Sequence, residues 1–278
     1  MKIYISVDME GISGITDKAY TTKGEWLYPV GQRLATADVN AAVRGAFDAG
    51  ADEVIVADMH ANSYNLLAES LDPRATLLSG VPHQPRFPFL DSTVDGVFLI
   101  GYHAMAGTLY GTLEHTMTSL SWHKFAVNGR AYGELGIDAS LAGESGVPVV
   151  MVSGDDKLCD EAKEWLGTVE TACVKQGLGR TCALCLSPEQ GQRQVYRAAH
   201  RAVERLITGE KFMLLESPGP ATVTITYKHT ADADAAGIFG AKRLDGYTVE
   251  RTYGRLSEMY GGIWADYGIA QRVQGEKV

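Results

Sequence analysis

The sequence is poor in cysteine and in positive charge, and it contains no long apolar run. Four cysteines among 278 residues are too few for the disulfide framework of a small secreted domain. The net charge of −9 argues against a nucleic-acid-binding surface, which is basic. No apolar run reaches the length of a membrane span, and acidic residues follow the short stretch Met1–Val7 at once, unlike in a signal peptide. These absences favour a cytoplasmic protein that binds neither nucleic acid nor membrane.

One pair of cysteines, Cys182-Ala-Leu-Cys185, has a spacing found in zinc and redox sites. The pair lacks a second Cys or His pair at finger-like spacing, and no strand–turn–helix pattern leads into it. Free cysteines are also among the residues most often buried. We therefore interpret both residues as packed or partly exposed thiols.

The whole chain is 45% hydrophobic and 21% charged. Strand-like and helix-like segments alternate along its first three quarters. Alternation at this spacing predicts an α/β fold with three layers, in which helices flank a largely parallel sheet. The predicted strands are Lys2–Val7, Glu53–Asp58, Val94–Ile100, Val149–Val152 and Thr168–Val174. The predicted helices are Gln32–Ala49, Gly133–Gly146, Asp155–Leu166 and Gln190–Ile207.

The last quarter of the chain has a different pattern. Glu216–Pro220, with the sequence Glu-Ser-Pro-Gly-Pro, is the best linker candidate. It divides an α/β core, residues 1–215, from a smaller α+β unit, residues 216–278, which is expected to contribute to packing or oligomer contacts. Strands Thr222–Tyr227 and Tyr247–Thr252 and a helix over Leu256–Ala270 are expected in that unit. Within the core, Asn128-Gly129 predicts an inserted β-hairpin.

Ionisable side chains follow three of the predicted strands. Asp8 and Glu10 follow the first, Asp58 and His60 end or follow the second, and His103 follows the third. Sites in parallel α/β sheets form at the carboxyl ends of strands, so these groups are expected at one edge. Carboxylates and imidazoles are the ligand set of zinc, manganese, cobalt or iron. Acids at a strand end can instead be compensated by an arginine or by water, so the pattern alone leaves those alternatives open.

Several motifs in order along the chain resemble the zinc-dependent D-aminopeptidases of the DppA type. They are Ser6-Val-Asp-Met-Glu-Gly-Ile-Ser-Gly14, Gly101-Tyr-His103, Glu114-His-Thr-Met117, Asn128-Gly129 with Gly133-Glu-Leu-Gly136, Gly154-Asp-Asp156 and Val174-Lys-Gln176. The resemblance extends from residue 1 to about residue 190. It implies two zinc ions per chain, with other divalent transition metals as substitutes, held by five ligands: Asp8, Glu10, His60, His103 and Glu134. It also places the catalytic histidine at His115.

Those residue types suit the chemistry that the resemblance implies. Five ligands are few for two ions, so one carboxylate is expected to bridge them, and Asp8 at the strand end is the candidate. Two ions about 3.5–4 Å apart can share a water, make it nucleophilic near neutral pH and polarise a peptide carbonyl. His115 can act as a general acid or base, as a proton shuttle or as a nucleophile. Proton transfer is the commonest catalytic use of histidine and is favoured here. Asp58 is expected either to support the site, as a carboxylate that orients a metal-bound imidazole, or to cap the end of its strand.

The resemblance implies an aminopeptidase that hydrolyses short peptides or amides with an N-terminal D-amino acid, D-alanine being the favoured residue. It also implies a homo-oligomer, with two stacked rings forming a decamer around a chamber. Two alternatives remain open from the sequence. One is a two-metal amidase or deacylase acting on another small amide, and the other is a non-catalytic binding protein with the same fold.

Overall fold

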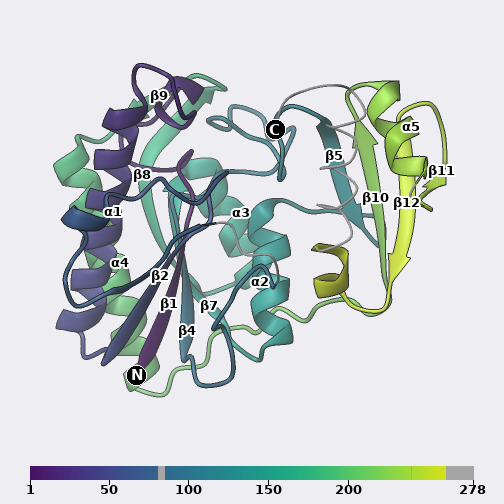
Figure 1. Cartoon of the computed structure of the whole chain (residues 1–278). Helices are drawn as coiled ribbons and strands as arrows, with labels where there is room; N and C mark the ends of the chain where they lie inside the picture. Colours follow the sequence, from purple (N-terminus) through teal and green to yellow (C-terminus); the bar gives the residue numbers. More distant parts are fainter. Residues whose placement is uncertain (81–84, 239, 261–278) are drawn as a thin grey trace.

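A seven-stranded sheet forms the centre of the computed structural model, which describes residues 1–80, 85–238 and 240–260 (Figure 1). Its strand order is β3-β2-β1-β4-β7-β8-β9. The strands are β1 (Lys2–Val7), β2 (Glu53–Asp58), β3 (Thr76–Leu78), β4 (Gly96–Ile100), β7 (Val149–Asp155), β8 (Glu170–Gly179) and β9 (Cys182–Cys185). Neighbours run parallel from β3 to β8, and β9 returns antiparallel at the edge. The predicted largely parallel sheet is confirmed.

Helices cover both faces of this sheet (Figure 1). Ile3, Ile5 and Val7 of β1 pack into one core with α1 (Tyr28–Asp48) and α4 (Pro188–Ile207). Tyr4, which points the opposite way on the same strand, packs into a second core with α2 (Glu134–Glu144) and α3 (Asp156–Leu166). The predicted three layers are therefore confirmed. Helix α1 begins four residues before the predicted start because Pro29 is tolerated in a first helical turn.

A second, antiparallel sheet lies beyond α2 and α3, with the order β11-β12-β10-β5-β6 (Figure 1). It contains the predicted hairpin, β5 (Trp122–Val127) and β6 (Arg130–Ala131), with Asn128 and Gly129 at φ values of 47° and 82° in the turn. The strands β10 (Ala221–Tyr227), β11 (Lys242–Arg243) and β12 (Thr248–Tyr253), with helix α5 (Thr230–Ile238), come from the last quarter of the chain. This sheet thus joins segments from both sides of residue 215, and the division there stays a prediction.

The structure describes the first part of the helix predicted near the end of the chain. The predicted helix over Leu256–Ala270 is helical at residues 256–260, and its remainder lies outside the described residues. Two short 3-10 turns, η1 (Lys18–Tyr20) and η2 (Ala68–Ser70), complete the elements. Within the ranges that the structure describes, no helix is both long and apolar enough to cross a membrane.

The carboxyl ends of β1, β2 and β4 lie level with one another. Val7 is in register with Asp58 on one side and with Ile100 on the other, so the residues after these three strands emerge at one edge. The strand order reverses between β1 and β4, which is where open α/β sheets form their binding sites. Gly11 closes the junction, because its N–H donates to the carbonyl of Gly101 at 2.7 Å.

Gly11→Ala is expected to destabilise this junction. A Cβ atom at Gly11 would lie 1.8 Å from the carbonyl oxygen of Tyr102, so the segments after β1 and β4 would have to separate. We expect the free energy of unfolding, measured by urea titration, to fall by about 1–3 kcal/mol, as for other overpacked sites. Gly179→Ala is the control, since a Cβ there meets nothing within 4 Å. Equal stability of the two variants would contradict the expected clash.

Candidate metal centre

The six predicted site residues lie together in the structure, although they are spread over more than 120 positions of the chain. Asp8 and Glu10 follow β1, His60 follows β2, His103 follows β4, His115 lies in the loop before β5 and Glu134 opens α2. Ligand atoms of Asp8, Glu10 and His103 lie within 4.8 Å of one another, as do those of His103, His115 and Glu134. His103 thus belongs to both groups and joins them.

Each of the three imidazoles has one nitrogen anchored to a backbone carbonyl. The anchoring contacts are His60 Nε2 to Thr21 O at 3.0 Å, His103 Nδ1 to Ala104 O at 3.0 Å and His115 Nδ1 to Leu113 O at 2.9 Å. A carbonyl oxygen only accepts hydrogen bonds, so the anchored nitrogen is the one that carries hydrogen. The other nitrogen of each neutral ring therefore carries a lone pair.

These lone-pair nitrogens all face carboxylate oxygens. His60 Nδ1 lies 2.8 Å from Asp8 Oδ1 and 3.2 Å from Glu10 Oε2. His103 Nε2 lies 3.4 Å from Asp8 Oδ2 and 3.2 Å from Glu134 Oε1, and His115 Nε2 lies 3.5 Å from the same Glu134 oxygen. Lone pairs that face each other repel unless a cation, either a proton or a metal ion, lies between them.

The donor set fits a metal ion better than it fits protons alone. Asp8 Oδ2, Glu10 Oε2 and His103 Nε2 are buried and have no hydrogen-bond partner. Buried polar groups in native proteins are otherwise almost always paired. Metal-binding histidines also characteristically donate their second N–H to a backbone carbonyl, as all three rings do here. The carboxylate and imidazole atoms are those that zinc accepts.

Burial and mutual charge shift the pKa values of the cluster. Burial, with the neighbouring Glu10 carboxylate, raises the pKa of Asp8 to about 7. Burial alone would raise the pKa of Glu134, but the His103 cation outweighs it and lowers the pKa to about 2. For His103, burial opposes the charged form, while Glu134 and Asp8 raise its pKa to about 10. The carboxylates therefore hold positive charge at this edge of the sheet.

His115 differs from the other two histidines. Burial, together with the His103 cation, lowers the pKa of His115 below its ordinary value of 6.5. Its ring stacks on that of His103, with centroids 4.0 Å apart and planes at 12°. The Glu134 oxygen beside it also accepts the N–H of Met117 at 2.7 Å. His115 is thus a neutral base near pH 7 at the margin of the cluster.

Asp58 supports the site in a different manner from a carboxylate that orients a ring. It accepts hydrogen bonds from the backbone N–H groups of Asn65 and Leu66 and from the Asn65 side chain, whose amide also donates to the carbonyl of His60 at 2.7 Å. Asp58 therefore stabilises the loop that carries His60. The His60 ring itself contacts Asp8, Glu10 and Thr21.

A buried polar network beneath the cluster was not identified from the sequence. Asp138, one helical turn after Glu134 on α2, accepts hydrogen bonds from Arg86 at 2.5 and 2.8 Å and from the Tyr102 hydroxyl at 2.6 Å. Tyr102 in turn contacts Ser6 Oγ at 2.7 Å. These contacts join β1, α2 and the end of β4, the elements that carry Asp8, Glu134 and His103. The four-residue spacing of Glu134 and Asp138 was the one available signal.

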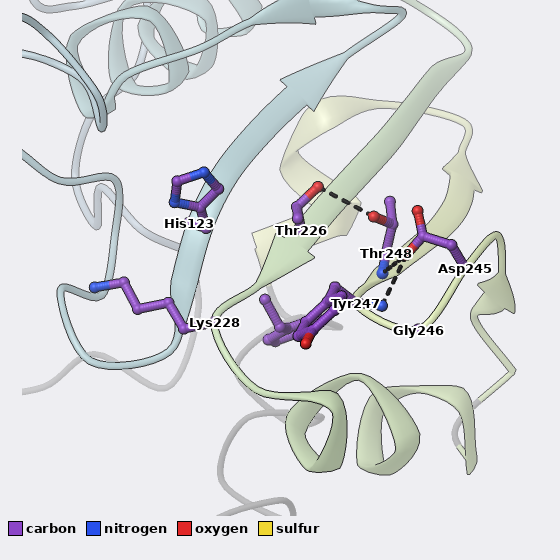
Figure 2. Close-up of a pocket in the computed structure, with 8 residues that line it drawn as sticks. His123, Thr226, Lys228, Asp245, Gly246, Tyr247 and Thr248 are labelled. Atoms are coloured by element: carbon purple, nitrogen blue, oxygen red, sulfur yellow. Dashed lines mark hydrogen bonds between the residues drawn. The ribbon is translucent and has the colours of Figure 1, made fainter.

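Two other features lie apart from the cluster. A surface hollow on the antiparallel sheet is lined by residues of β5, β10 and segment 245–248, among them His123, and contains none of the six residues (Figure 2). Cys182 is exposed and Cys185 half-buried on β9, as free thiols. In the part of the chain that the structure describes, the candidate metal-binding groups include no cysteine.

Comparison with known proteins identifies the family of this chain. A family model described as D-aminopeptidase matches residues 1–265. A D-aminopeptidase of Bacillus subtilis (strain 168) is 38% identical over 239 residues, which is 86% of this chain and 85% of that protein. A solved structure, the Zn-dependent D-aminopeptidase DppA from Bacillus subtilis, described as a self-compartmentalizing protease, superposes with a TM-score of 0.91 at 36% identity, covering 98% of both chains. The chain belongs to the D-aminopeptidase family.

Proposed function

We propose that this D-aminopeptidase is zinc-dependent and releases the N-terminal D-amino acid of short peptides or amides, with D-alanine as the favoured residue. The observation that carries the proposal is the set of anchored imidazoles whose free nitrogens face buried carboxylates. Such an arrangement requires cations, and the similarity to a Zn-dependent relative supports zinc. Zinc supplies Lewis-acid chemistry, which polarises a peptide carbonyl and makes water acidic near neutral pH.

The ligand set that we propose is Asp8, Glu10, His60, His103 and Glu134, holding two ions. Asp8 suits the bridging role because its two oxygens face different rings: Oδ1 lies near His60 and Oδ2 near His103. One ion would then lie among Asp8, Glu10 and His60. The other would lie among Asp8, His103 and Glu134. This division assigns the three unpartnered buried atoms of the cluster, Asp8 Oδ2, Glu10 Oε2 and His103 Nε2, to an ion.

His115 would transfer protons. Its Nδ1–H is held by Leu113, so Nε2 is the basic atom, and this atom lies on the side of Glu134. A neutral Nε2 takes a proton from an attacking water and returns it to the amine that leaves. This assignment favours acid–base chemistry over covalent attack by the ring, because the ring is held by hydrogen bonding and stacking rather than aimed by a further base.

The assembly and its location complete the proposal. The solved relative is described as self-compartmentalizing, which supports a homo-oligomer for this chain, with a decamer of two stacked rings as the proposed form. Enclosure in a chamber would restrict substrates to short peptides. We propose that residues 1–215 form the catalytic core and that residues 216–278 contribute to packing or subunit contacts. We also propose that the protein is cytoplasmic.

Profiling with paired D- and L-substrates tests the function. Zinc-loaded protein with measured metal content is given D-alanine amide, L-alanine amide and the corresponding dipeptides, and amino-acid release is followed. We expect kcat/KM for the D-substrates to exceed that for the L-substrates by at least about 100-fold, since stereochemistry is read through several contacts at once. Equal turnover of both series, or turnover of neither, would contradict the proposal.

A further inference from the structure

Lys175 is a buried cation that the catalytic proposal leaves without a role. It lies on β8 and is only 2% exposed. Its ammonium donates hydrogen bonds to three backbone carbonyls: Glu10 at 2.6 Å, Ile12 at 3.1 Å and Ile15 at 2.5 Å. An ammonium has three N–H donors, so these contacts use all of them. Lys175 is therefore committed entirely to the segment formed by residues 10–15.

Burial of an ammonium at this position is unfavourable because of its desolvation free energy. Lys175 is buried, so its ammonium has lost the hydration that it would have in water. The hydrogen-bond acceptors are carbonyl oxygens, which offset less of the desolvation than a carboxylate would. Methionine would fill the same volume at lower cost, but it could not bind the carbonyls. Retention of the ammonium thus points to the segment that it binds.

The segment 10–15 carries one of the proposed zinc ligands. Glu10 opens it, and Glu10 Oε2 is buried, without a hydrogen-bond partner and 3.2 Å from His60 Nδ1. This carboxylate oxygen is therefore not fixed by a hydrogen bond to the protein. The backbone of the segment is tied to the end of β4 through Gly11 N–H and to α1 through Ser13 N–H, which donates to Asp38 at 2.9 Å. Lys175 supplies the connection to β8.

We propose that Lys175 is a positioning residue for the metal centre: by binding the carbonyls of Glu10, Ile12 and Ile15, it fixes the backbone from which the Glu10 carboxylate reaches its ion. All three hydrogen bonds of the Lys175 ammonium go to backbone carbonyls, so Lys175 acts through Glu10. The inference rests on the proposed function only in taking Glu10 as a ligand. It assigns a role to Lys175 within the motif Val174-Lys-Gln176, for which no role was apparent from the sequence.

Zinc affinity, measured by competition with a chromogenic chelator, tests the proposal. Lys175→Met is expected to weaken zinc binding by about 10–100-fold, the usual effect of removing a group that orients a ligand. Val203→Ala is the control for stability, because Val203 is fully buried on α4 in the core with α1. This variant should unfold at lower urea concentration while keeping the affinity of the wild type. Equal affinity of Lys175→Met and wild type would overturn the proposal.

Chemical rescue provides the second measurement. Lys175→Ala leaves a space beside three carbonyls that methylammonium can enter, so added methylammonium should recover most of the lost zinc affinity. An equal concentration of sodium chloride should recover none. Loss of affinity without rescue, or failure of both Lys175 variants to fold even with methylammonium present, would assign Lys175 to the core of the fold and overturn its positioning role.

Glu10→Gln separates this inference from the proposed function. If Glu10→Gln binds zinc as tightly as the wild type, Glu10 is not a ligand and the proposed ligand set is wrong. If Glu10→Gln loses affinity while Lys175→Met retains it, the ligand set stands and the inference about Lys175 is wrong. Reduced affinity in both variants, with no further loss in the double variant beyond that of Glu10→Gln, is the result expected when Lys175 acts through Glu10.

Discussion

Asp8→Ala is expected to remove most of the zinc from this protein. Asp8 faces His60 with one oxygen and His103 with the other, so its loss takes a ligand from both proposed ions. We expect zinc affinity to fall by more than about 100-fold, beyond the effect of mutating an orienting group. Metal analysis of protein purified without chelator gives the measurement. The rise in melting temperature on adding zinc should also disappear, since that rise reflects binding to the folded state.

Glu170→Ala is the matched control for the loss of an acid. Glu170 opens β8, at the opposite edge of the sheet from the cluster, and pairs with Arg201 and Arg205. Its removal should change stability slightly and leave zinc content unchanged. If Asp8→Ala keeps the zinc content of the wild type, Asp8 neither bridges nor binds the ions.

His115→Ala is expected to lower kcat by about 10²–10⁴-fold, the usual contribution of a positioned acid or base. Zinc content should remain at the wild-type level, because His115 is outside the proposed ligand set. Burial lowers the pKa of His115 below 6.5. The neutral base form is therefore present at a pH above this lowered pKa and is lost as the pH falls through it. The acid limb of the kcat profile should therefore report this group in the wild type and vanish in His115→Ala.

Zinc content distinguishes proton transfer by His115 from metal binding by His115. Its Nε2 lies within the same group of potential ligand atoms as His103 and Glu134. Loss of zinc in His115→Ala would then accompany the loss of activity, and the assignment as a proton-transfer residue would be wrong. His115→Gln, which retains a polar side chain of similar length, shows whether volume alone accounts for the effect.

Local pattern was sufficient to predict most of the core. Residues such as Ile3, Ile5 and Val7 alternate with Tyr4 and Ser6 on a strand buried from both sides, and period and length alone indicate such a strand. The three layers followed because parallel strands require crossover helices on their faces. The pairing of β5 with β10 did not follow, since strands about 100 residues apart carry no local mark of their partner. The antiparallel sheet therefore emerged only from the structure.

The site, like the fold, was predictable from the sequence only in part. Asp8, Glu10, His60 and His103 follow strands, so the rule that parallel strands end at one edge was enough to group them from the sequence. His115 and Glu134 came from the resemblance, because a loop histidine and a glutamate in a first helical turn have ordinary structural uses. The structure alone showed the carbonyl anchors that determine which ring nitrogen carries a lone pair. Orientation of this kind depends on contacts between segments distant in the chain.

The sequence by itself determined the α/β class, the family and the residues that converge on the site, because periodicity, strand-end position and motif order are properties of the chain. Only the tertiary structure decided how Asp8 stands between two histidines and how Lys175 binds the segment that carries Glu10. Both depend on burial and on hydrogen bonds between residues 52 to 165 positions apart in the sequence. Such contacts exist only once the sheet has brought its strands together.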